Sequence, residues 1–123
     1  MTKRLLIVDD DSMFIQLLEL DLDKRSMIVD LKRAHDGLQA IEAIENAQPH
    51  VLVLDLRMPN ADGFAVLEHI KERNYGFPVI VLTNYSRPDY REKCSQYGVH
   101  EYIVKNEMPL AQIMGKVQEY VEA

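Results

Sequence analysis

Short apolar runs recur along the chain and set the pattern of its fold. Four of them stand out: LLIV (5–8), VLVL (51–54), VIVL (79–82) and YIV (102–104). Continuous apolar runs of this length, in which β-branched residues recur, are typical of parallel strands covered on both faces. A fifth segment, IVDLKRA (28–34), mixes polar and apolar positions and indicates an edge strand with one wetter side.

The segments between these runs have the spacing of amphipathic helices. We expect helices to begin after the caps Asp11 and Ser12 and to cover 38–47, 63–73, about 88–97 and 109–121. The side chains expected to face the core are Phe14, Leu17 and Leu18 in the first helix, Leu38, Ile41 and Ile44 with Ala40 beside them in the second, Phe64, Leu67 and Ile70 in the third, Tyr90, Cys94 and Tyr97 in the weaker stripe of the fourth, and Leu110, Ile113, Met114, Val117 and Val121 in the fifth.

The resulting order is a strand followed by a helix, repeated five times. This order predicts an α/β fold of the (βα)5 type, in which right-handed crossovers place helices over a parallel sheet. The 123 residues suit one hydrophobic core, and the sequence has no repeat, linker or low-complexity tract. We therefore expect a single domain over residues 1–123.

Composition narrows the class of protein. The formal net charge of −6 argues against direct nucleic-acid binding, which needs a basic surface. No apolar run reaches the roughly 18 residues of a membrane span, so we expect no membrane insertion. The start MTKRLLIVDDD reaches its acids too soon for a signal peptide, and the single cysteine, Cys94, cannot form an internal disulfide. These features favour a cytoplasmic protein.

Polar side chains follow the apolar runs at the points where the predicted strands end. In open parallel sheets, binding sites form beyond the carboxyl ends of the strands. If the first and third strands are neighbours, their carboxylates converge, and a hydroxyl and an ammonium group flank them. The residues concerned are Asp9, Asp10 and Asp11 after the first strand, Asp55 after the third, Thr83 and Asn84 at the end of the fourth, and Lys105 after the fifth.

This set of residues suits metal-dependent phosphoryl chemistry. Clustered carboxylates raise one another's pKa unless they share a cation. Oxygen ligands with open water positions suit Mg²⁺, with Mn²⁺ as an alternative ion. A carboxylate beside Mg²⁺ can attack a phosphoryl group and carry it as an aspartyl phosphate. Lys105 can neutralise one phosphoryl oxygen, and Thr83 can donate its hydroxyl to another.

The same residues form a pattern that runs along the whole chain. It consists of the acid pair Asp9-Asp10, Asp55 followed by Met58-Pro59, then Asp62-Gly63, Thr83, Tyr102 and Lys105. In this pattern the chain resembles the receiver domain of two-component response regulators, of the stand-alone, single-domain kind. The resemblance implies a three-layer, doubly wound, flavodoxin-like fold with a five-stranded parallel sheet of order 2-1-3-4-5, and no output domain.

The resemblance also implies how the carboxylates are used. Asp55 would be the phosphoacceptor, and the phosphoryl group would come from a phosphohistidine on a sensor histidine kinase or a histidine phosphotransfer protein. Asp10, Asp55 and the backbone carbonyl of Arg57 would bind Mg²⁺, and Asp9 would help through a water molecule. Such a domain catalyses only its own phosphorylation and dephosphorylation, so we expect no turnover enzyme.

A switch and its partners follow from the same resemblance. Thr83 and Lys105 would contact the phosphoryl group, and Thr83 and Tyr102 would transmit its presence to the surface around helix four, strand five and helix five. An output protein that the sequence does not identify would read that surface. Met13 and Ile15, if exposed, would suit docking of a kinase helix; the alternative is peripheral core packing.

Four positions tune or depart from the family pattern. Asn106 follows Lys105 where the family usually has proline after a cis peptide bond. Because a cis bond before a non-proline residue costs about 2.5–4 kcal/mol, we expect a trans bond and a reshaped loop. Asn84 replaces a small residue and is expected to narrow access to the phosphoacceptor. Arg57 and Tyr85 occupy the two variable positions that modulate phosphoryl lifetime in the family.

Each site residue also has a structural explanation. The N-terminus of the first helix favours negative charge, so Asp9 and Asp10 could cap it, and Asp11 is best explained in this way. Asp55 could cap a turn before Pro59. Likewise, Thr83 could satisfy a local backbone group, and Lys105 could be an ordinary surface lysine. Tyr102 could lie in the core or at the edge of the sheet.

Aromatic residues and histidines outside the pattern leave two further questions. Four tyrosines in the last two-fifths of the chain could line a partner surface or be half-buried, and the sequence favours neither; they are Tyr85, Tyr90, Tyr97 and Tyr102. Cys94 and the histidines have no ligand spacing and are expected to be incidental; the histidines are His35, His50, His69 and His100.

Three other functions compete with the phosphorylation switch. A receiver-like protein-binding module that works without phosphorylation is motivated by Asn84 and Asn106. A haloacid-dehalogenase-type phosphatase needs a second carboxylate two residues after its nucleophile, where this chain has Arg57. A flavodoxin-like electron carrier needs a phosphate-binding loop after the first strand, where three aspartates would repel the phosphate of FMN.

Overall fold

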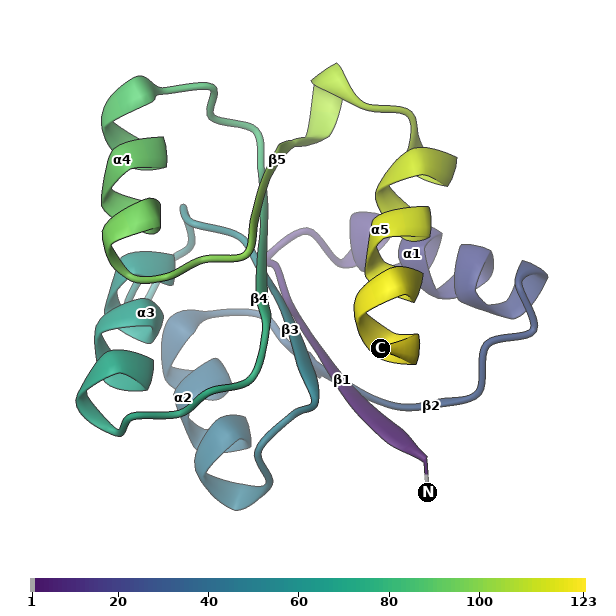
Figure 1. Ribbon diagram of the computed structural model, residues 1–123, viewed down its shortest axis with the longest axis horizontal. Coiled ribbons are helices and arrows are strands. Elements are labelled where there is room, and N and C mark those ends of the chain that lie inside the picture. The colour runs from purple at the N-terminus through teal and green to yellow at the C-terminus, as the bar shows by residue number, and fades with distance from the viewer. Residues whose placement is uncertain (1) are drawn as a thin grey trace.

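Five strands alternate with five helices in the computed structural model, which describes residues 2–123 (Figure 1). The strands are β1 (Lys3–Val8), β2 (Val29–Ala34), β3 (Val51–Leu54), β4 (Val79–Thr83) and β5 (Glu101–Val104). The helices are α1 (Ser12–Lys24), α2 (Gly37–Asn46), α3 (Gly63–Glu72), α4 (Pro88–Gln96) and α5 (Leu110–Glu122), with a short 3-10 turn, η1 (Lys105–Glu107). The predicted (βα)5 order is confirmed. Every helix in the described part of the chain is too short or too polar to cross a membrane.

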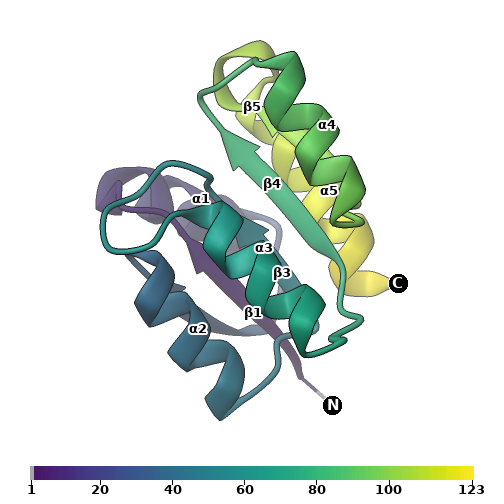
Figure 2. The same cartoon turned by 90° about the vertical axis from the view of Figure 1, so that its left-hand side faces the viewer.

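All neighbouring strands of the sheet are parallel, and their order is β2-β1-β3-β4-β5. The predicted order 2-1-3-4-5 is therefore confirmed, as is the position of β2 at an edge. Helices α1 and α5 cover one face of the sheet, and α2, α3 and α4 cover the other, so the fold has three layers (Figures 1 and 2). Strand order reverses between β1 and β3, which is where such folds form their sites.

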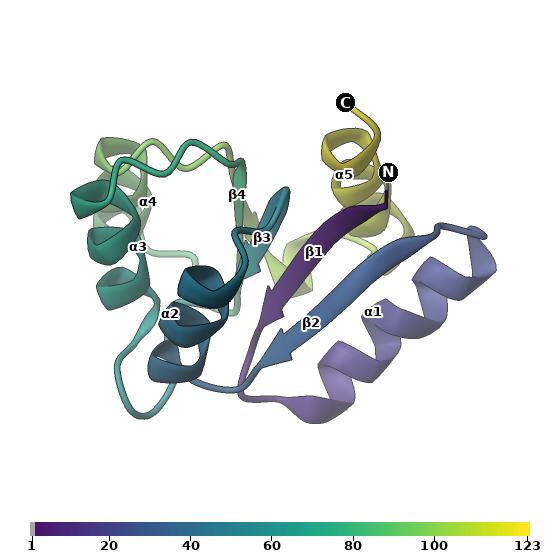
Figure 3. The same cartoon turned by 90° about the horizontal axis from the view of Figure 1, so that it is seen from below.

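Two hydrophobic cores lie on opposite faces of the sheet, because successive strand side chains point to opposite sides. Leu5 and Ile7 of β1 pack with α1 and α5, while Leu6 and Val8 pack with the α2, α3 and α4 side. Figure 3 shows the sheet between these two layers from below. Strands β3 and β4 are buried over their whole length, as the apolar runs predict.

Helix α1 is rotated relative to the prediction. Its buried residues are Ile15, Leu18 and Leu22, whereas Leu17 is 49% exposed and Phe14 is only partly buried. The predicted inward position of Leu17 is wrong because this helix has apolar residues on more than one face, so spacing alone does not select the buried stripe. Ile15 belongs to the core and therefore leaves the candidate docking surface, on which Met13 remains, 76% exposed.

The second helix shows a similar correction. Leu38 is 61% exposed, whereas Gly37, Ala40 and Ile44 are buried and Ile41 is partly buried. The backbone explains this orientation, since Gly37 packs so tightly that a Cβ there would lie 2.2 Å from the carbonyl oxygen of Ala61. In α3 the buried side chains are Val66, Leu67 and Ile70, with Phe64 partly buried, and in α5 the predicted stripe is confirmed except that Leu110 is half-buried.

Aspartate side chains fix the start of three helices at the carboxyl edge of the sheet. Asp11 accepts a hydrogen bond from the backbone N–H of Phe14, Asp36 from Gln39 and Asp62 from Ala65. A side-chain acceptor at this position satisfies a backbone donor that the helix leaves unpaired. The prediction that Asp11 caps the first helix is confirmed.

Two glycines provide a matched test of how tightly the loop after β3 is packed. A Cβ at Gly63 would lie 2.4 Å from the carbonyl oxygen of Asp55 and 2.8 Å from the Cα of Leu56, whereas one at Gly115, inside α5, meets no atom within 4 Å. We expect Gly63→Ala to lower the free energy of unfolding by roughly 1–3 kcal/mol. Gly115→Ala should raise it by about 1 kcal/mol, as alanine favours a helix interior. Urea denaturation measures both changes; a Gly63→Ala protein as stable as the parent would contradict the packing.

Candidate functional site

Three carboxylates meet where β1 and β3 end. Asp9, Asp10 and Asp55 each place one oxygen so that the three oxygens lie within 4.8 Å of one another. Parallel pairing of Val8 with Leu54 brings the two strand ends side by side, and the N–H of Asp55 donates to the carbonyl of Val8 at 2.9 Å. The predicted convergence is therefore present in the structure. Asp9 and Asp55 are 3% and 5% exposed, whereas Asp10 is exposed.

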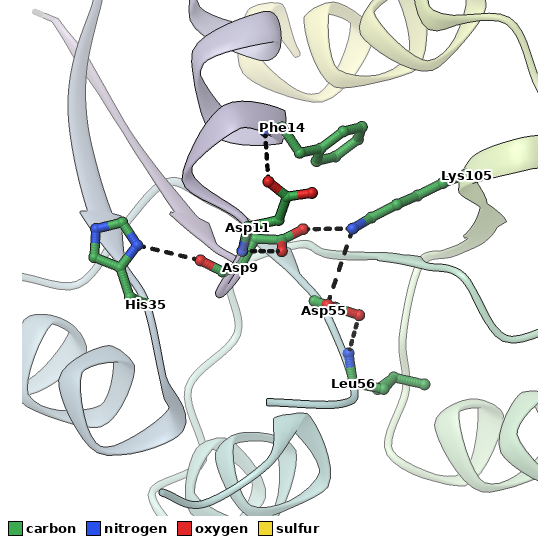
Figure 4. Close-up of polar contacts among 7 residues, drawn as sticks. All are labelled: Asp9, Asp11, Phe14, His35, Asp55, Leu56 and Lys105. Carbon is green, nitrogen blue, oxygen red and sulfur yellow. Dashed lines mark hydrogen bonds and ion pairs between the residues drawn. The ribbon is translucent and has the colours of Figure 1, made fainter. Parts of the chain in front are cut away.

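Lys105 supplies the positive charge beside these acids. Its Nζ lies 2.7 Å from Oδ2 of Asp9 and 3.9 Å from Oδ2 of Asp55 (Figure 4). Only 10% of its side chain is exposed, so the alternative that Lys105 is an ordinary surface lysine is wrong. Removing one member of such a buried ion pair typically costs 3–5 kcal/mol, because the other charge is left without a partner.

The path of the chain after β5 differs from that of a cis-peptide loop. Residues 2–123 contain no cis peptide bond, so the bond between Lys105 and Asn106 is trans, as expected, and η1 follows directly. The lysine nevertheless reaches the acids. Its ammonium group lies 4.2 Å from the ring centroid of Phe14, which projects from α1 (Figure 4). Sequence reasoning missed this cation–π contact, since nothing in the spacing links Phe14 to Lys105.

Asp55 carries an incompletely balanced charge. Its Oδ1 accepts a hydrogen bond from the N–H of Leu56 at 2.8 Å, which agrees in part with a turn-forming role. Burial has the largest effect and raises the pKa of Asp55; the charge of Lys105 lowers it, that of Asp9 raises it, and the Thr83 hydroxyl and the Leu56 N–H lower it. A further positive charge beside Asp55, in addition to that of Lys105, would therefore stabilise its ionised carboxylate.

Asp9 is held by contacts on both sides. Its Oδ1 accepts from the backbone N–H of Asp11 at 2.9 Å, and its Oδ2 faces Lys105. The Nδ1 of His35 lies 3.3 Å from its backbone carbonyl (Figure 4). This arrangement fixes Asp9 against the lysine and leaves the exposed carboxylate of Asp10 the most accessible of the three to an incoming cation.

Thr83 is fully buried at the end of β4, and its hydroxyl has no hydrogen-bond partner within 3.5 Å among residues 2–123, although it lies near enough to the carboxylate of Asp55 to lower the pKa of that group. The alternative that Thr83 satisfies a local backbone group is therefore wrong. An unsatisfied buried hydroxyl costs roughly 1–3 kcal/mol, so its presence points to a ligand that would accept its hydrogen bond. Strand pairing sets Thr83 opposite Val104, the residue before Lys105.

Two of the three predicted modulators, Arg57 and Tyr85, line the approach to the carboxylates. Arg57 is exposed and its guanidinium Nη1 lies 3.4 Å from the hydroxyl of Tyr90. Tyr85 is 42% exposed, and Asn84 is exposed beside it. An open hollow of about 340 Å³ at this point is lined by Asp10, Arg57, Met58, Pro59, Asp62 and Tyr85.

Tyr102 links β5 to the loop that follows β4. Its hydroxyl donates to the backbone carbonyl of Tyr85 at 2.6 Å, two residues after Thr83. The pKa of Tyr102 is raised to about 12, mainly by burial of its hydroxyl. Of the four tyrosines that could line a partner surface, Tyr90, Tyr97 and Tyr102 are half-buried and Tyr85 is exposed.

Comparisons with known proteins agree on one family. Residues 5–118 match the family described as the response regulator receiver domain. The uncharacterized 14.6 kDa protein in the sodA1 3' region of Leptolyngbya boryana is 33% identical, over 94% of this chain and 88% of its own. The response regulator MprA of Mycobacterium ulcerans is 34% identical, over 85% of this chain and 44% of its own. The crystal structure of a DNA-binding response regulator of the LuxR family from Staphylococcus aureus has 28% identity and a TM-score of 0.84, over 97% of this chain and 98% of that chain.

The match in length differs among the curated relatives. This chain spans about half the length, or less, of most of those it matches first. The matched region covers 80–85% of this chain in these five relatives.

Stability should depend on pH through Asp55. Because its folded pKa lies above the unfolded value of about 3.9, ionising this carboxyl destabilises the folded state as pH rises through the folded pKa. In divalent-free buffer at pH 7, Asp55→Asn should therefore unfold at a higher urea concentration than the parent, and this advantage should vanish below about pH 3.9. Asp23→Asn, at an exposed position of α1, is the control and should show no such pattern. A less stable Asp55→Asn protein at pH 7 would contradict this assignment.

Proposed function

The chain belongs to the family of response regulator receiver domains, and we propose that it is a phosphorylation-dependent signalling switch with Asp55 as its phosphoacceptor. The donor is a phosphohistidine on a sensor histidine kinase or a histidine phosphotransfer protein. The observation that carries the proposal is the buried cluster of Asp9, Asp55 and Lys105 beside the unpartnered hydroxyl of Thr83.

The chemistry proposed for Asp55 is a simple transfer. One of its carboxylate oxygens forms a bond to phosphorus while the phosphorus–nitrogen bond of the phosphohistidine breaks, and the electron pair returns to the imidazole nitrogen. The N–H of Leu56 holds Oδ1, which leaves Oδ2 on the side of Lys105. The domain therefore catalyses its own phosphorylation, and hydrolysis of the aspartyl phosphate by water then releases inorganic phosphate and restores the carboxylate.

The acid cluster fits a divalent cation. Three oxygen ligands within 4.8 Å of one another and a buried carboxyl with a raised pKa are what Mg²⁺ or Mn²⁺ would stabilise. We assign the ligands to Asp10, Asp55 and the backbone carbonyl of Arg57, with Asp9 acting through water. When bound, the ion neutralises charge that carboxylate and phosphoryl oxygens would otherwise place close together.

Lys105 and Thr83 complete the proposed phosphoryl site. The ammonium group neutralises one phosphoryl oxygen, and the hydroxyl of Thr83 donates to another, which would satisfy this buried group. As Thr83 turns toward the phosphoryl group, the loop after β4 moves, and Tyr102 exchanges its hydrogen bond with the carbonyl of Tyr85 for an inward position. Arg57, Asn84 and Tyr85 control how readily water reaches the phosphoryl group.

Residues 1–123 are proposed to form one receiver domain. Its phosphorylation state is read by a partner protein that contacts its surface. The reading surface comprises α4, β5 and α5, to which Tyr102 belongs. We place this switch in the cytoplasm, where histidine kinases draw on ATP. The departures at Asn84 and Asn106 motivate the alternative of a receiver-like module that works without phosphorylation. It is not favoured, because Lys105 reaches Asp9 at 2.7 Å despite the trans bond before Asn106.

Divalent cations should stabilise the folded protein. At a hundredfold excess of Mg²⁺ over its dissociation constant, the free energy of unfolding should rise by about 2.7 kcal/mol, seen as an increase of several degrees in Tm. Asp10→Asn should lose most of this increase, whereas Asp23→Asn, exposed and outside the cluster, should keep it. An unchanged Tm in the parent protein at high Mg²⁺ would favour the phosphorylation-independent module.

Lys105 should accelerate phosphorylation by a small donor such as acetyl phosphate. We expect a hydroxylamine-labile adduct, seen as a gain in intact mass, which Asp55→Ala should abolish. Lys105→Met should slow its formation on the order of a hundredfold, since a charged donor to the phosphoryl group is lost. Lys32→Met, an exposed lysine of β2, is the control. Circular dichroism at low temperature establishes that Lys105→Met is folded, and a parent-like rate in the folded variant would contradict the role.

A further inference from the structure

Helix α4 contacts the rest of the molecule through few buried groups. Cys94 is its one buried residue, and its half-buried Tyr90 packs against aromatic rings of neighbouring segments. Phe64 and Tyr90 meet edge to face at 5.3 Å between ring centroids, and Tyr85 and Tyr90 at 6.0 Å. The surface around α4 is therefore built from aromatic side chains.

Cations lie over these rings. Arg87 stacks on Tyr90 and Arg91 on Tyr102, each at 4.6 Å from the ring centroid. Two lysines make similar contacts, and an arginine lies at the edge of the group. These are Lys93 at 4.3 Å from Phe64, Lys71 at 5.6 Å from Tyr97, and Arg57 at 3.4 Å from the hydroxyl of Tyr90. We call Arg57, Lys71, Arg87, Arg91 and Lys93 the α4 cationic surface; all five are exposed.

The charges of this surface are largely unpaired. Among residues 2–123, only Arg87 of the five has a carboxylate within 4.0 Å, Asp89 at 2.9 Å. Among the nearby acids, Glu68 accepts a hydrogen bond from the hydroxyl of Tyr97. Glu92 of α4 is exposed and forms no ion pair with these cations. A chain with a net charge of −6 thus places around α4 four cations that have no carboxylate partner in the described part of the chain: Arg91 and Lys93 on the helix itself, Lys71 on α3 and Arg57 after β3.

This combination has the chemistry of a protein interface. Arginine and tyrosine are enriched where proteins bind one another, and a guanidinium stacked on a ring is held in place before a partner arrives. Cations that lack carboxylate partners within the fold are complementary to carboxylates from outside, and opposite charge also speeds encounter.

We infer that the α4 cationic surface binds an acidic peptide segment of the output protein. This inference rests on the proposed function for the identity of the partner, but the surface itself is independent of Asp55. A peptide fits better than a nucleic acid, because Glu68, Asp89 and Glu92 lie among the cations. A peptide can place its few carboxylates at the cations alone, whereas a continuous phosphate backbone would also bring negative charge against these three acids.

The same surface contains the proposed switch. Arg91 stacks on Tyr102, whose hydroxyl is bonded to the carbonyl of Tyr85. Any inward movement of Tyr102 removes the ring on which Arg91 rests and so changes how this cation is presented. The affinity for an acidic segment should therefore differ between the two states of the switch.

A titration with defined probes tests the inference. The probes are a fluorescein-labelled twelve-residue peptide of Glu, Asp, Leu and Phe, its matched copy with Gln and Asn for each acid, and a single-stranded DNA twelve-mer. We expect the acidic peptide to bind the unphosphorylated protein at least tenfold more tightly than the neutral copy, and more weakly as salt is added. The double variant Arg91→Gln, Lys93→Gln should lose roughly tenfold in affinity, whereas the matched double variant Lys24→Gln, Lys32→Gln should retain it.

Three results would overturn the inference. They are equal affinity for the acidic and neutral peptides, equal loss in the control double variant, and tighter binding of the DNA at the same residues. A failure of Asp55 to accept a phosphoryl group would refute the proposed function while leaving peptide binding measurable. In the protein treated with Mg²⁺ and beryllofluoride, the acidic peptide should bind with an affinity changed at least threefold; an unchanged affinity would refute the link between Tyr102 and this surface.

Discussion

The enforced closeness of Asp9 and Asp55 at the ends of two parallel strands is the constraint on which the rest of the site depends. The pairing of Val8 with Leu54 sets the carboxylates that follow them side by side, and both are almost fully buried. Like charges in such a place need compensation. Lys105 provides one positive charge from the end of the edge strand β5, yet burial still raises the pKa of Asp55. A cation and a phosphoryl group are the partners that this imbalance and the unpartnered Thr83 hydroxyl would accept.

The apolar runs were sufficient to predict the strands, because buried parallel strands leave a continuous signature that tolerates few alternatives. Strand ends then located the acids, the threonine and the lysine before any contact was known. The buried helix faces were harder. In α1 and α2, apolar residues such as Leu17 and Leu38 point outward, and their burial is decided by how each helix packs rather than by its own spacing.

Contacts between distant side chains could not be inferred from the sequence. The ring of Phe14 lies 91 positions before Lys105 in the chain and yet faces its ammonium group, and only the three-dimensional path of α1 and η1 brings them together. The roles assigned to Asp10, Arg57 and Tyr102 remain predictions of the family resemblance. The structure adds the hydrogen bond that ties Tyr102 to the loop after Thr83, a physical route between the acid cluster and α4.

Chemical mapping of the phosphorylated residue tests the central claim most directly. Borohydride reduces an aspartyl phosphate to homoserine, so the protein is treated with acetyl phosphate and Mg²⁺, reduced, digested and analysed by tandem mass spectrometry. The account predicts homoserine at position 55, and none when Mg²⁺ is replaced by a chelator. Homoserine at another aspartate, or an unmodified Asp55 in a protein shown to be folded, would contradict it.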